Sequence, residues 1–165
     1  MKFKVIFLDI DGVLNSTKWA ISLDGEFNHP INQVDPAAVA RLNRITDATG
    51  AKIVVSSAWR RVFQIQAADP LLSLQGCLKT YGVTGEVIDM TPYKPNCVRN
   101  RRGKEIEEWV NENYSVIEKF VVIDDSIDDI GKMKKHLVRT ILEDGLTDPI
   151  TDQIISILGK KDGSA

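Results

Sequence analysis

Three short apolar runs, each followed at once by polar or acidic residues, constrain the fold of this chain most strongly. They lie at residues 3–8, 51–55 and 120–123, and weaker strand candidates lie at 86–90 and 137–142. Apolar runs of this length without polar alternation are typical of strands that are buried on both faces of a parallel sheet. The sequence therefore predicts a sheet whose buried strands come from distant parts of the chain.

The segments between these runs have the spacing and the end signals of helices. Asp35-Pro36 is typical of an N-cap followed by a first-turn proline, and Gly50 of a helix end. Further helices are predicted up to about residue 80, with a break at Asp69-Pro70, then at 104–111 and after Thr147. Strands that alternate with helices predict an α/β fold, a Rossmann-like, doubly wound and mostly parallel sheet.

The chain has 165 residues, which is an ordinary length for one domain. We expect residues 1–159 to form it, with a flap or loop insert at 15–34 where the sequence is polar and irregular. Residues 91–103 are expected to form a loop, and residues 160–165 a flexible tail. These connections leave room for no cap domain, or only a minimal one.

Charge and composition exclude several classes of protein. The net charge is -2 and the pI about 5.7, so any attraction to nucleic acid must come from a local patch. Cys77 and Cys97 lack a CxxC spacing, which argues against a zinc site and fits a reducing compartment. The first apolar run is interrupted by Asp9 and is too short for a signal peptide or a membrane span. We therefore expect no membrane association and a cytoplasmic location.

Carboxylates at the predicted strand ends indicate a metal site. Asp9 and Asp11 follow the first run, Ser56 the second, and Asp124 and Asp125 the third. Ligands bind beyond the carboxyl ends of the strands in an open parallel sheet, so these residues are expected to converge. Four carboxylates in one place would repel one another. Ligands that are all oxygen suit Mg²⁺, so the sequence predicts a magnesium site.

The same residues resemble the motifs of haloacid dehalogenase (HAD) superfamily phosphatases. DIDGV at 9–13 is similar to the first motif, DxDGxx, and VVS at 54–56 to the second, an apolar strand that ends in Ser or Thr. A basic residue near Lys104 resembles the third motif, and VIDDSIDD at 122–129 resembles the fourth. The order and the spacing match across residues 3–130, which is most of the chain.

A narrower resemblance covers nearly the whole sequence. Its matching segments are SSAWR at 56–60, RGKEIEEWV at 102–110, VVIDDSIDDI at 121–130 and DGLT at 144–147. They are similar to the HAD phosphatase domain of Swiss Army Knife RNA repair-like proteins, a branch that also occurs as stand-alone chains.

The resemblance implies a role for each residue of the first two motifs. Asp9 would attack phosphorus and form an aspartyl-phosphate, while Mg²⁺ bridges Asp9 and a phosphate oxygen. Asp11 would be the acid and then the base, and its backbone carbonyl a metal ligand. Gly12 would let the backbone turn sharply beside the substrate. Ser56 would donate a hydrogen bond to the phosphoryl group, with Ser57 as its substitute.

Two further assignments stay open between alternatives. In the fourth motif, the resemblance favours Asp125 as the direct metal ligand. Asp124 would then bind the metal through water. Asp129 would position these groups without binding the metal itself. In the third motif, either Arg102 or Lys104 would neutralise the phosphate. The superfamily favours a Lys and the narrower branch an Arg, and Lys104 is preferred here.

Other residues near the motifs are candidates for substrate binding. Arg60 is a candidate phosphate ligand, and Trp59 a candidate for stacking on a base; a solvated Arg and a packed Trp are the alternatives. His29, in the insert, is either a surface residue or a contact of the leaving group. A basic run without an acidic residue is either a solvated loop or a surface that steers an anionic substrate; it consists of Lys94, Arg99, Arg101, Arg102 and Lys104.

We therefore predict a Mg²⁺-dependent phosphomonoesterase that acts through an aspartyl-phosphate. Uncapped sites in this superfamily tend to take large substrates, which favours the phosphorylated 3′ or 5′ ends of nucleic acids. Phosphatases of small metabolites, nucleotides or phosphoproteins are alternatives. A non-catalytic receiver-like or binding module is a further alternative. Asp11 argues against a receiver, because receivers lack a second Asp two residues after the phosphorylated one.

Overall fold

The computed structural model describes residues 1–159, and the predicted flexible tail at 160–165 lies outside the described residues. Its centre is a sheet of five strands in the order β3-β2-β1-β4-β5. Every neighbouring pair of strands is parallel, which confirms the predicted α/β architecture. The strands are β1 (Phe3–Leu8), β2 (Lys52–Val55), β3 (Val87–Met90), β4 (Ile117–Asp124) and β5 (Leu137–Arg139).

The register of the three central strands brings their carboxyl ends to one level. Leu8 of β1 is paired with Val55 of β2 and with Ile123 of β4. The ladder continues beyond the strand, because the Asp9 amide donates to the Ile123 carbonyl at 3.0 Å and the Ser56 amide to the Leu8 carbonyl at 2.9 Å. The polar residues that follow the three apolar runs therefore meet at one edge of the sheet.

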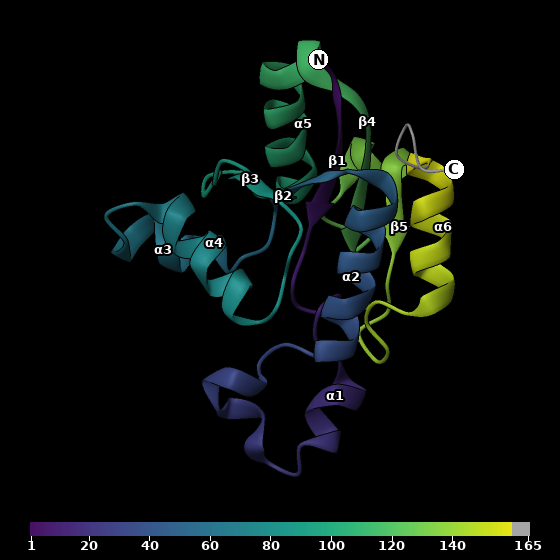
Figure 1. Cartoon of the computed structure of the whole chain (residues 1–165). Helices are drawn as coiled ribbons and strands as arrows, with labels where there is room; N and C mark the ends of the chain where they lie inside the picture. The colour runs from purple at the N-terminus through teal and green to yellow at the C-terminus, as the bar shows by residue number, and fades with distance from the viewer. Residues whose placement is uncertain (160–165) are drawn as a thin grey trace.

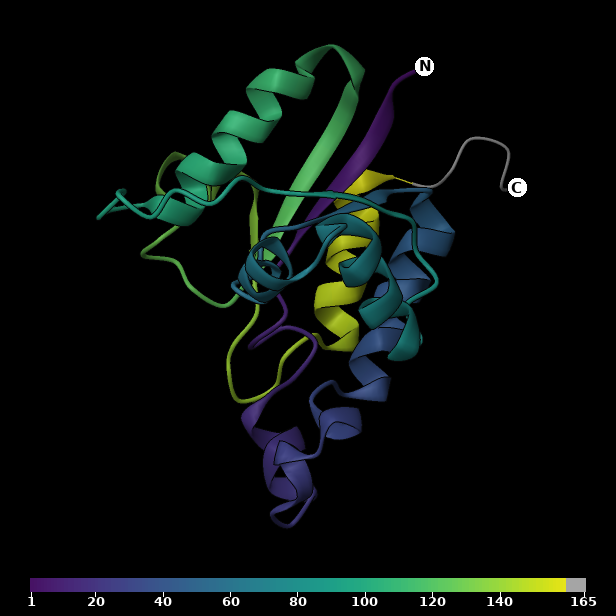
Figure 2. The ribbon, with the colours of Figure 1, turned by 90° about the vertical axis from the view of Figure 1, so that its left-hand side faces the viewer.

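Helices cover both faces of the sheet, as its strands require (Figures 1 and 2). Along β1, Ile6 and Leu8 belong to one buried cluster, whereas Val5 and Phe7 belong to another. The first cluster is closed by α2 (Pro36–Thr49), α4 (Pro70–Thr80) and α6 (Asp148–Leu158), and the second by α5 (Arg101–Asn113). Successive strand residues point to opposite faces, so apolar residues without alternation fill both cores.

Most predicted helix signals act as expected. The Asp35 carboxylate accepts a hydrogen bond from the Ala37 amide at 2.8 Å and caps α2, which ends at Gly50 in the left-handed conformation. Asp69 divides the next helical stretch into α3 (Arg60–Gln66) and α4. The predicted start of α5 at Lys104 is wrong by three residues, because the helix begins at Arg101.

The insert at 15–34 is not the irregular loop that its composition predicts. It contains α1 (Thr17–Ser22) and two 3-10 helices, at Glu26–Asn28 and Pro30–Asn32. Figure 1 shows it projecting beyond the carboxyl end of β1. The Trp19 indole donates to the Asn32 carbonyl at 2.8 Å and holds the insert closed on itself. Across residues 1–159, helices lack the length and apolar character needed to cross a bilayer.

Candidate active site

Three carboxylates gather where β1 and β4 end. Asp9, Asp124 and Asp125 can each offer one oxygen so that all three oxygens lie within 4.8 Å of one another. The Asp9 side chain is almost covered, and Asp124 is 1% exposed. They line a pocket of about 260 Å³, together with Asp11, Ala58, Arg102, Ser126 and Asp129.

Crowding and burial oppose the ionisation of Asp9 and Asp124. Burial raises the pKa of Asp9, and the Arg102 guanidinium and the hydrogen bond from Ser57 only partly oppose this. The pKa of Asp124 is raised to about 7, first by burial and then by the nearby charge of Asp9. A cation bound between Asp9 and Asp124, with Asp125 beside them, would offset the charge that burial and crowding penalise.

The donor set fits Mg²⁺. Asp124 Oδ2 is buried and accepts no hydrogen bond from the described residues, which leaves a carboxylate oxygen available for a cation. Its nearest positive charge is Arg102 Nε at 3.8 Å. Asp9, Asp124 and Asp125 supply only oxygen ligands, as a hard cation prefers, and are the residues that would hold Mg²⁺. The Asp11 carboxylate is not part of this group.

Gly12 makes room for one of these ligands. It has a φ of 73°, and a Cβ added there would lie 2.5 Å from Cγ and Oδ2 of Asp125. Its carbonyl accepts a hydrogen bond from the Thr140 hydroxyl at 2.7 Å, which ties the turn to the segment after β5. Gly12 is therefore required because the Asp125 carboxylate lies so close to it. The close approach of a substrate, which the first motif implies, would be a second reason.

Arg102 is the basic residue that the structure brings to the carboxylates. Its Nη1 lies 3.4 Å from Asp9 Oδ1. Asp129 sets its position: Oδ1 accepts from the Arg101 amide at 2.7 Å, and Oδ2 lies 3.4 Å from the Arg102 amide. Such capping of exposed amides stabilises the first turn of α5 and explains its early start. The role expected for Asp129, which is to position neighbouring groups without binding the metal itself, is consistent with this contact.

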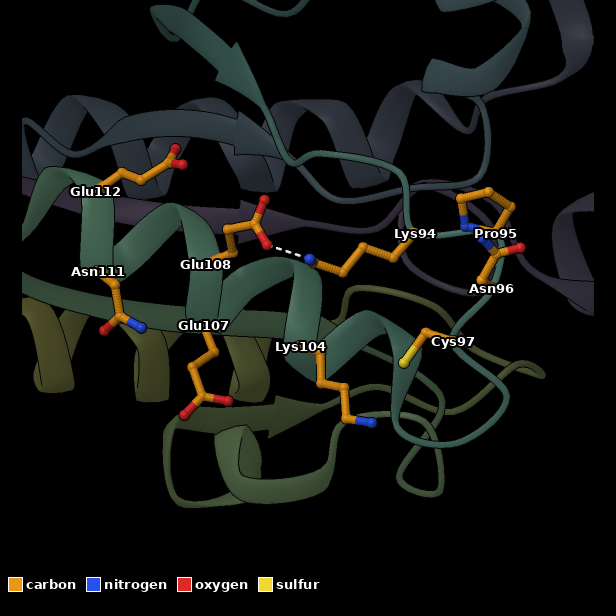
Figure 3. A pocket seen from close by; sticks show the side chains of 9 residues that line it. All are labelled: Lys94, Pro95, Asn96, Cys97, Lys104, Glu107, Glu108, Asn111 and Glu112. Carbon is orange, nitrogen blue, oxygen red and sulfur yellow. Dashed lines mark ion pairs between the residues drawn. The ribbon is translucent and has the colours of Figure 1, made fainter.

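Lys104 does not line the carboxylate pocket, so of the two candidates for the third motif the geometry favours Arg102 over the preferred Lys104. Residues two positions apart on a helix are separated by about 200° of rotation, so Arg102 and Lys104 lie on nearly opposite sides of α5. Figure 3 shows the exposed Lys104 on the wall of a second pocket, of about 740 Å³, which lies along α5 beside Cys97. Lys94, at the same pocket, is paired with Glu108.

Of the two serines after β2, Ser57 is the one whose hydroxyl reaches Asp9. The Ser57 hydroxyl donates to the Asp9 carboxylate and lowers its pKa. Ser56 is fully buried, and its hydroxyl has no hydrogen-bond partner among residues 1–159. Adjacent residues at a strand end point in different directions, so only one serine can face Asp9. The geometry favours Ser57.

Arg60 is not placed to hold a substrate phosphate. It is 2% exposed and forms an ion pair with Glu105, which is equally buried. Burial lowers its pKa, and the charge of Glu105 opposes this. Every N–H of the guanidinium has an acceptor within the protein. Besides Glu105, these acceptors are the carbonyls of Ser56, Ser57, Thr91 and Pro92.

Asp11 is held by two neutral donors that the sequence did not point to. The Trp59 indole nitrogen lies 3.1 Å from both carboxylate oxygens. The Asn15 amide donates to Oδ1 at 2.8 Å, while its own oxygen accepts from the Gly12 amide. Neither alternative for Trp59, stacking on a base or packing in the core, includes this hydrogen bond. For Asn15 the available signal was a polar residue directly after the apolar Val13-Leu14 pair.

A basic rim lies next to the carboxylate pocket. The guanidinium of Arg61 lies 4.5 Å from the centre of the Tyr93 ring, and that of Arg101 lies 5.6 Å from it. These three residues share a small pocket with Ala58 and Arg102, which also line the carboxylate pocket. Neither Arg61 nor Arg101 is ion-paired within the described part of the chain. His29, by contrast, accepts from the Ile31 amide in the exposed insert.

A five-stranded parallel sheet with a DxD turn after its first strand and an acidic pair after its fourth defines a HAD-type domain. The family model described as HAD domain in Swiss Army Knife RNA repair proteins matches residues 5–150. The chain belongs to this family, which places it among HAD-type phosphatases in general. Searches of curated proteins and of solved structures find no match to the chain.

Proposed function

We propose that this protein is a Mg²⁺-dependent phosphomonoesterase in which Asp9 is the nucleophile. The observation that carries the proposal is the setting of Asp9. One of its oxygens faces Arg102, the Ser57 hydroxyl donates to it, and two further carboxylates complete a metal-ligand group. A buried Asp with only a structural role would not require both a guanidinium and two further carboxylates beside it. The family assignment supports the same class of reaction.

The reaction has two balanced steps. First, an oxygen of Asp9 attacks phosphorus, the bond from phosphorus to the ester oxygen breaks, and Asp11 gives its proton to that oxygen. Then water attacks the aspartyl-phosphate, Asp11 takes a proton from it, and phosphate leaves with Asp9 regenerated. Arg102 and Ser57 bind phosphoryl oxygens in both steps. Mg²⁺, when bound, offsets the negative charge that collects between the phosphate and Asp9.

The rim favours a substrate with more than one phosphate. Arg61, Tyr93 and Arg101 offer two guanidiniums and an aromatic ring beside the pocket of the reacting phosphate. A second phosphate and a base next to a terminal phosphate match these groups. We therefore propose a phosphorylated 3′ or 5′ end of a nucleic acid as the substrate, with small metabolites, nucleotides and phosphoproteins as alternatives. Cys77 and Cys97 form no disulfide, which fits the proposed cytoplasmic location.

Phosphate release from a substrate panel, with Mg²⁺ and with EDTA, tests the proposal. The panel contains p-nitrophenyl phosphate, matched 3′- and 5′-phosphorylated oligonucleotides, a nucleoside monophosphate and a phosphopeptide. We expect Mg²⁺-dependent turnover, fastest on one oligonucleotide end. Fastest turnover on the nucleotide or the peptide would keep the chemistry and change the substrate class. Phosphorylation of Asp9 without multiple turnover would contradict the phosphatase and favour a receiver-like module.

Variants of the rim separate substrate class from chemistry. Arg61→Ala combined with Arg101→Ala removes both unpaired guanidiniums and leaves the carboxylate pocket unchanged. KM for the oligonucleotide should rise about tenfold or more, and its salt dependence should weaken, because two phosphate contacts are lost. Turnover of p-nitrophenyl phosphate should stay within about twofold. Equal effects on both substrates would show that the rim does not bind an extended substrate.

A further inference from the structure

We infer that Trp59 is a positioning residue, whose indole N–H holds the Asp11 carboxylate in place for proton transfer to the leaving oxygen. This inference rests on the proposed function, because it assigns to Asp11 the proton transfers of that reaction. The nitrogen lies at the same distance, 3.1 Å, from both oxygens of Asp11. A donor equidistant from two oxygens lies near the bisector of the carboxylate and restrains its rotation.

The contacts of Asp11 also distinguish its two oxygens. Asn15 donates to Oδ1 at 2.8 Å, so among residues 1–159 Oδ1 accepts from two donors and Oδ2 from Trp59 alone. A carboxylate oxygen has two lone pairs, so Oδ2 keeps one free. Unlike Asp9, Asp124 and Asp125, Asp11 is exposed, so a substrate can reach it. The geometry therefore points to Oδ2 as the atom that carries the proton.

Both donors to Asp11 are neutral, in contrast to the environment of Asp9. Asp9 faces the permanent charge of Arg102, while no Lys, Arg or His within residues 1–159 forms an ion pair with Asp11. An ion pair would fix the charge of the carboxylate as well as its position. An indole and an amide position the carboxylate without placing a permanent charge beside it.

The indole is itself held from behind. Its ring contacts the Tyr81 ring edge to face, with centroids 6.2 Å apart, and the Tyr81 hydroxyl donates to the Pro30 carbonyl of the insert. The Trp59 amide donates to the Ser57 hydroxyl at 3.3 Å. The turn at residues 57–59 thus contacts both candidate catalytic carboxylates, Asp9 through Ser57 and Asp11 through Trp59.

Trp59→Phe tests the inference, because it keeps an aromatic ring against Tyr81 and removes only the donor. Trp19→Phe is the matched control, since the Trp19 indole donates to the Asn32 carbonyl within the insert. The rate of phosphoenzyme formation is measured by rapid quench with two esters. One is a 3′- or 5′-phosphorylated oligonucleotide, whose alkoxide must be protonated as it leaves, and the other is p-nitrophenyl phosphate, whose phenolate leaves unaided.

For Trp59→Phe we expect the rate with the oligonucleotide to fall roughly ten- to a hundredfold, with KM little changed. This loss is a part of the rate acceleration that a general acid usually provides. The rate with p-nitrophenyl phosphate should change by less than about threefold, and Trp19→Phe should leave both rates within about twofold. In an Asp11→Asn background, Trp59→Phe should have almost no further effect, because it acts through Asp11.

Three results would overturn the inference while leaving the proposed function intact. They are an equal loss on both esters, a rise in KM for the oligonucleotide without a change in rate, and a full Trp59→Phe effect in the Asp11→Asn background. The second of these would assign Trp59 to base stacking. A wild-type protein that hydrolyses neither ester would overturn the proposed function, and the inference with it.

Discussion

Arg60 and Glu105 form an ion pair in which each side chain is only 2% exposed. Arg60 follows the strand end that carries Ser57, and Glu105 lies one helical turn after Arg102. Glu105 also accepts from the Lys94 amide at 2.9 Å. The pair therefore fixes α5 against the end of β2. It also fixes the distance between Arg102 and Ser57 of the candidate site.

Loss of this pair should unfold the protein more easily. Glu105→Gln removes the charge that faces a buried guanidinium, and we expect it to lower the free energy of unfolding by roughly 3–5 kcal/mol. Urea denaturation measures the change. Glu107→Gln on the same helix, outside the pair, is the control and should cost less than about 0.5 kcal/mol. An unchanged midpoint for Glu105→Gln would mean that the pair contributes no net stability.

Arg102, rather than Lys104, should be the cation of the third motif. Arg102→Ala removes the guanidinium that faces Asp9, and we expect kcat/KM to fall by about a hundredfold or more. Lys104→Ala removes an exposed side chain that lines another pocket, and it should change kcat/KM by less than about twofold. Steady-state kinetics on p-nitrophenyl phosphate compare the two variants. The opposite ranking would restore Lys104 as the phosphate ligand.

Ser57 should matter more for the reaction than Ser56. Ser57→Ala removes the hydroxyl that donates to Asp9, and we expect kcat to fall by roughly ten- to a hundredfold. Ser56→Ala removes a buried hydroxyl without a hydrogen-bond partner in the described residues, so activity and stability should hardly change. The pair of variants is assayed side by side for turnover and for melting temperature. A larger kinetic effect at Ser56 would reverse the assignment.

Gly12→Ala should weaken metal binding. The added Cβ would lie 2.5 Å from the Asp125 carboxylate and would also strain a backbone with a φ of 73°. Asp125 must therefore move, which should reduce Mg²⁺ affinity by about tenfold or more, the penalty for displacing one ligand. Isothermal titration calorimetry measures this affinity. Gly25→Ala, where a Cβ meets nothing within 4 Å, controls for the cost of a left-handed φ.

The stability of the metal-free protein should fall as pH rises. The pKa of Asp124 is about 7 in the folded state, above its ordinary value of 3.8, so between these pH values the folded protein holds a proton that the unfolded chain has lost. The contribution of Asp124 to stability is therefore fully present at low pH and declines until the pH passes about 7, by a few kcal/mol at most. Mg²⁺ binds the ionised form and should stabilise the protein more at higher pH.

Chemical denaturation in EDTA and in Mg²⁺, across this pH range, checks the prediction. Asp124→Asn cannot titrate at this position, so the decline in EDTA should become shallower in that variant, and the raised pKa of Asp9 accounts for what is left. A stability in EDTA that rises between about pH 5 and about pH 7 would contradict the raised pKa.

Much of the fold could be predicted because its causes are local. An apolar run without alternation predicts a buried strand, Asp35 and Gly50 mark the ends of α2, and alternation of strands and helices predicts a parallel sheet. The carboxylates could be placed together because parallel strands end at one edge. The structure differs in the insert, where residues that look irregular form α1, which Ser16 caps through the Trp19 amide.

The sequence by itself determined the parallel sheet and the meeting of Asp9, Asp124 and Asp125, because chain direction and strand length are sufficient to specify them. Only the tertiary structure decided between Arg102 and Lys104, because the rotation of α5 depends on a cap from Asp129, a residue distant in sequence. The same holds for Arg60, which is buried against Glu105, and for Trp59, which contacts Asp11. Which groups surround a side chain is settled by packing between segments, and no local pattern records it.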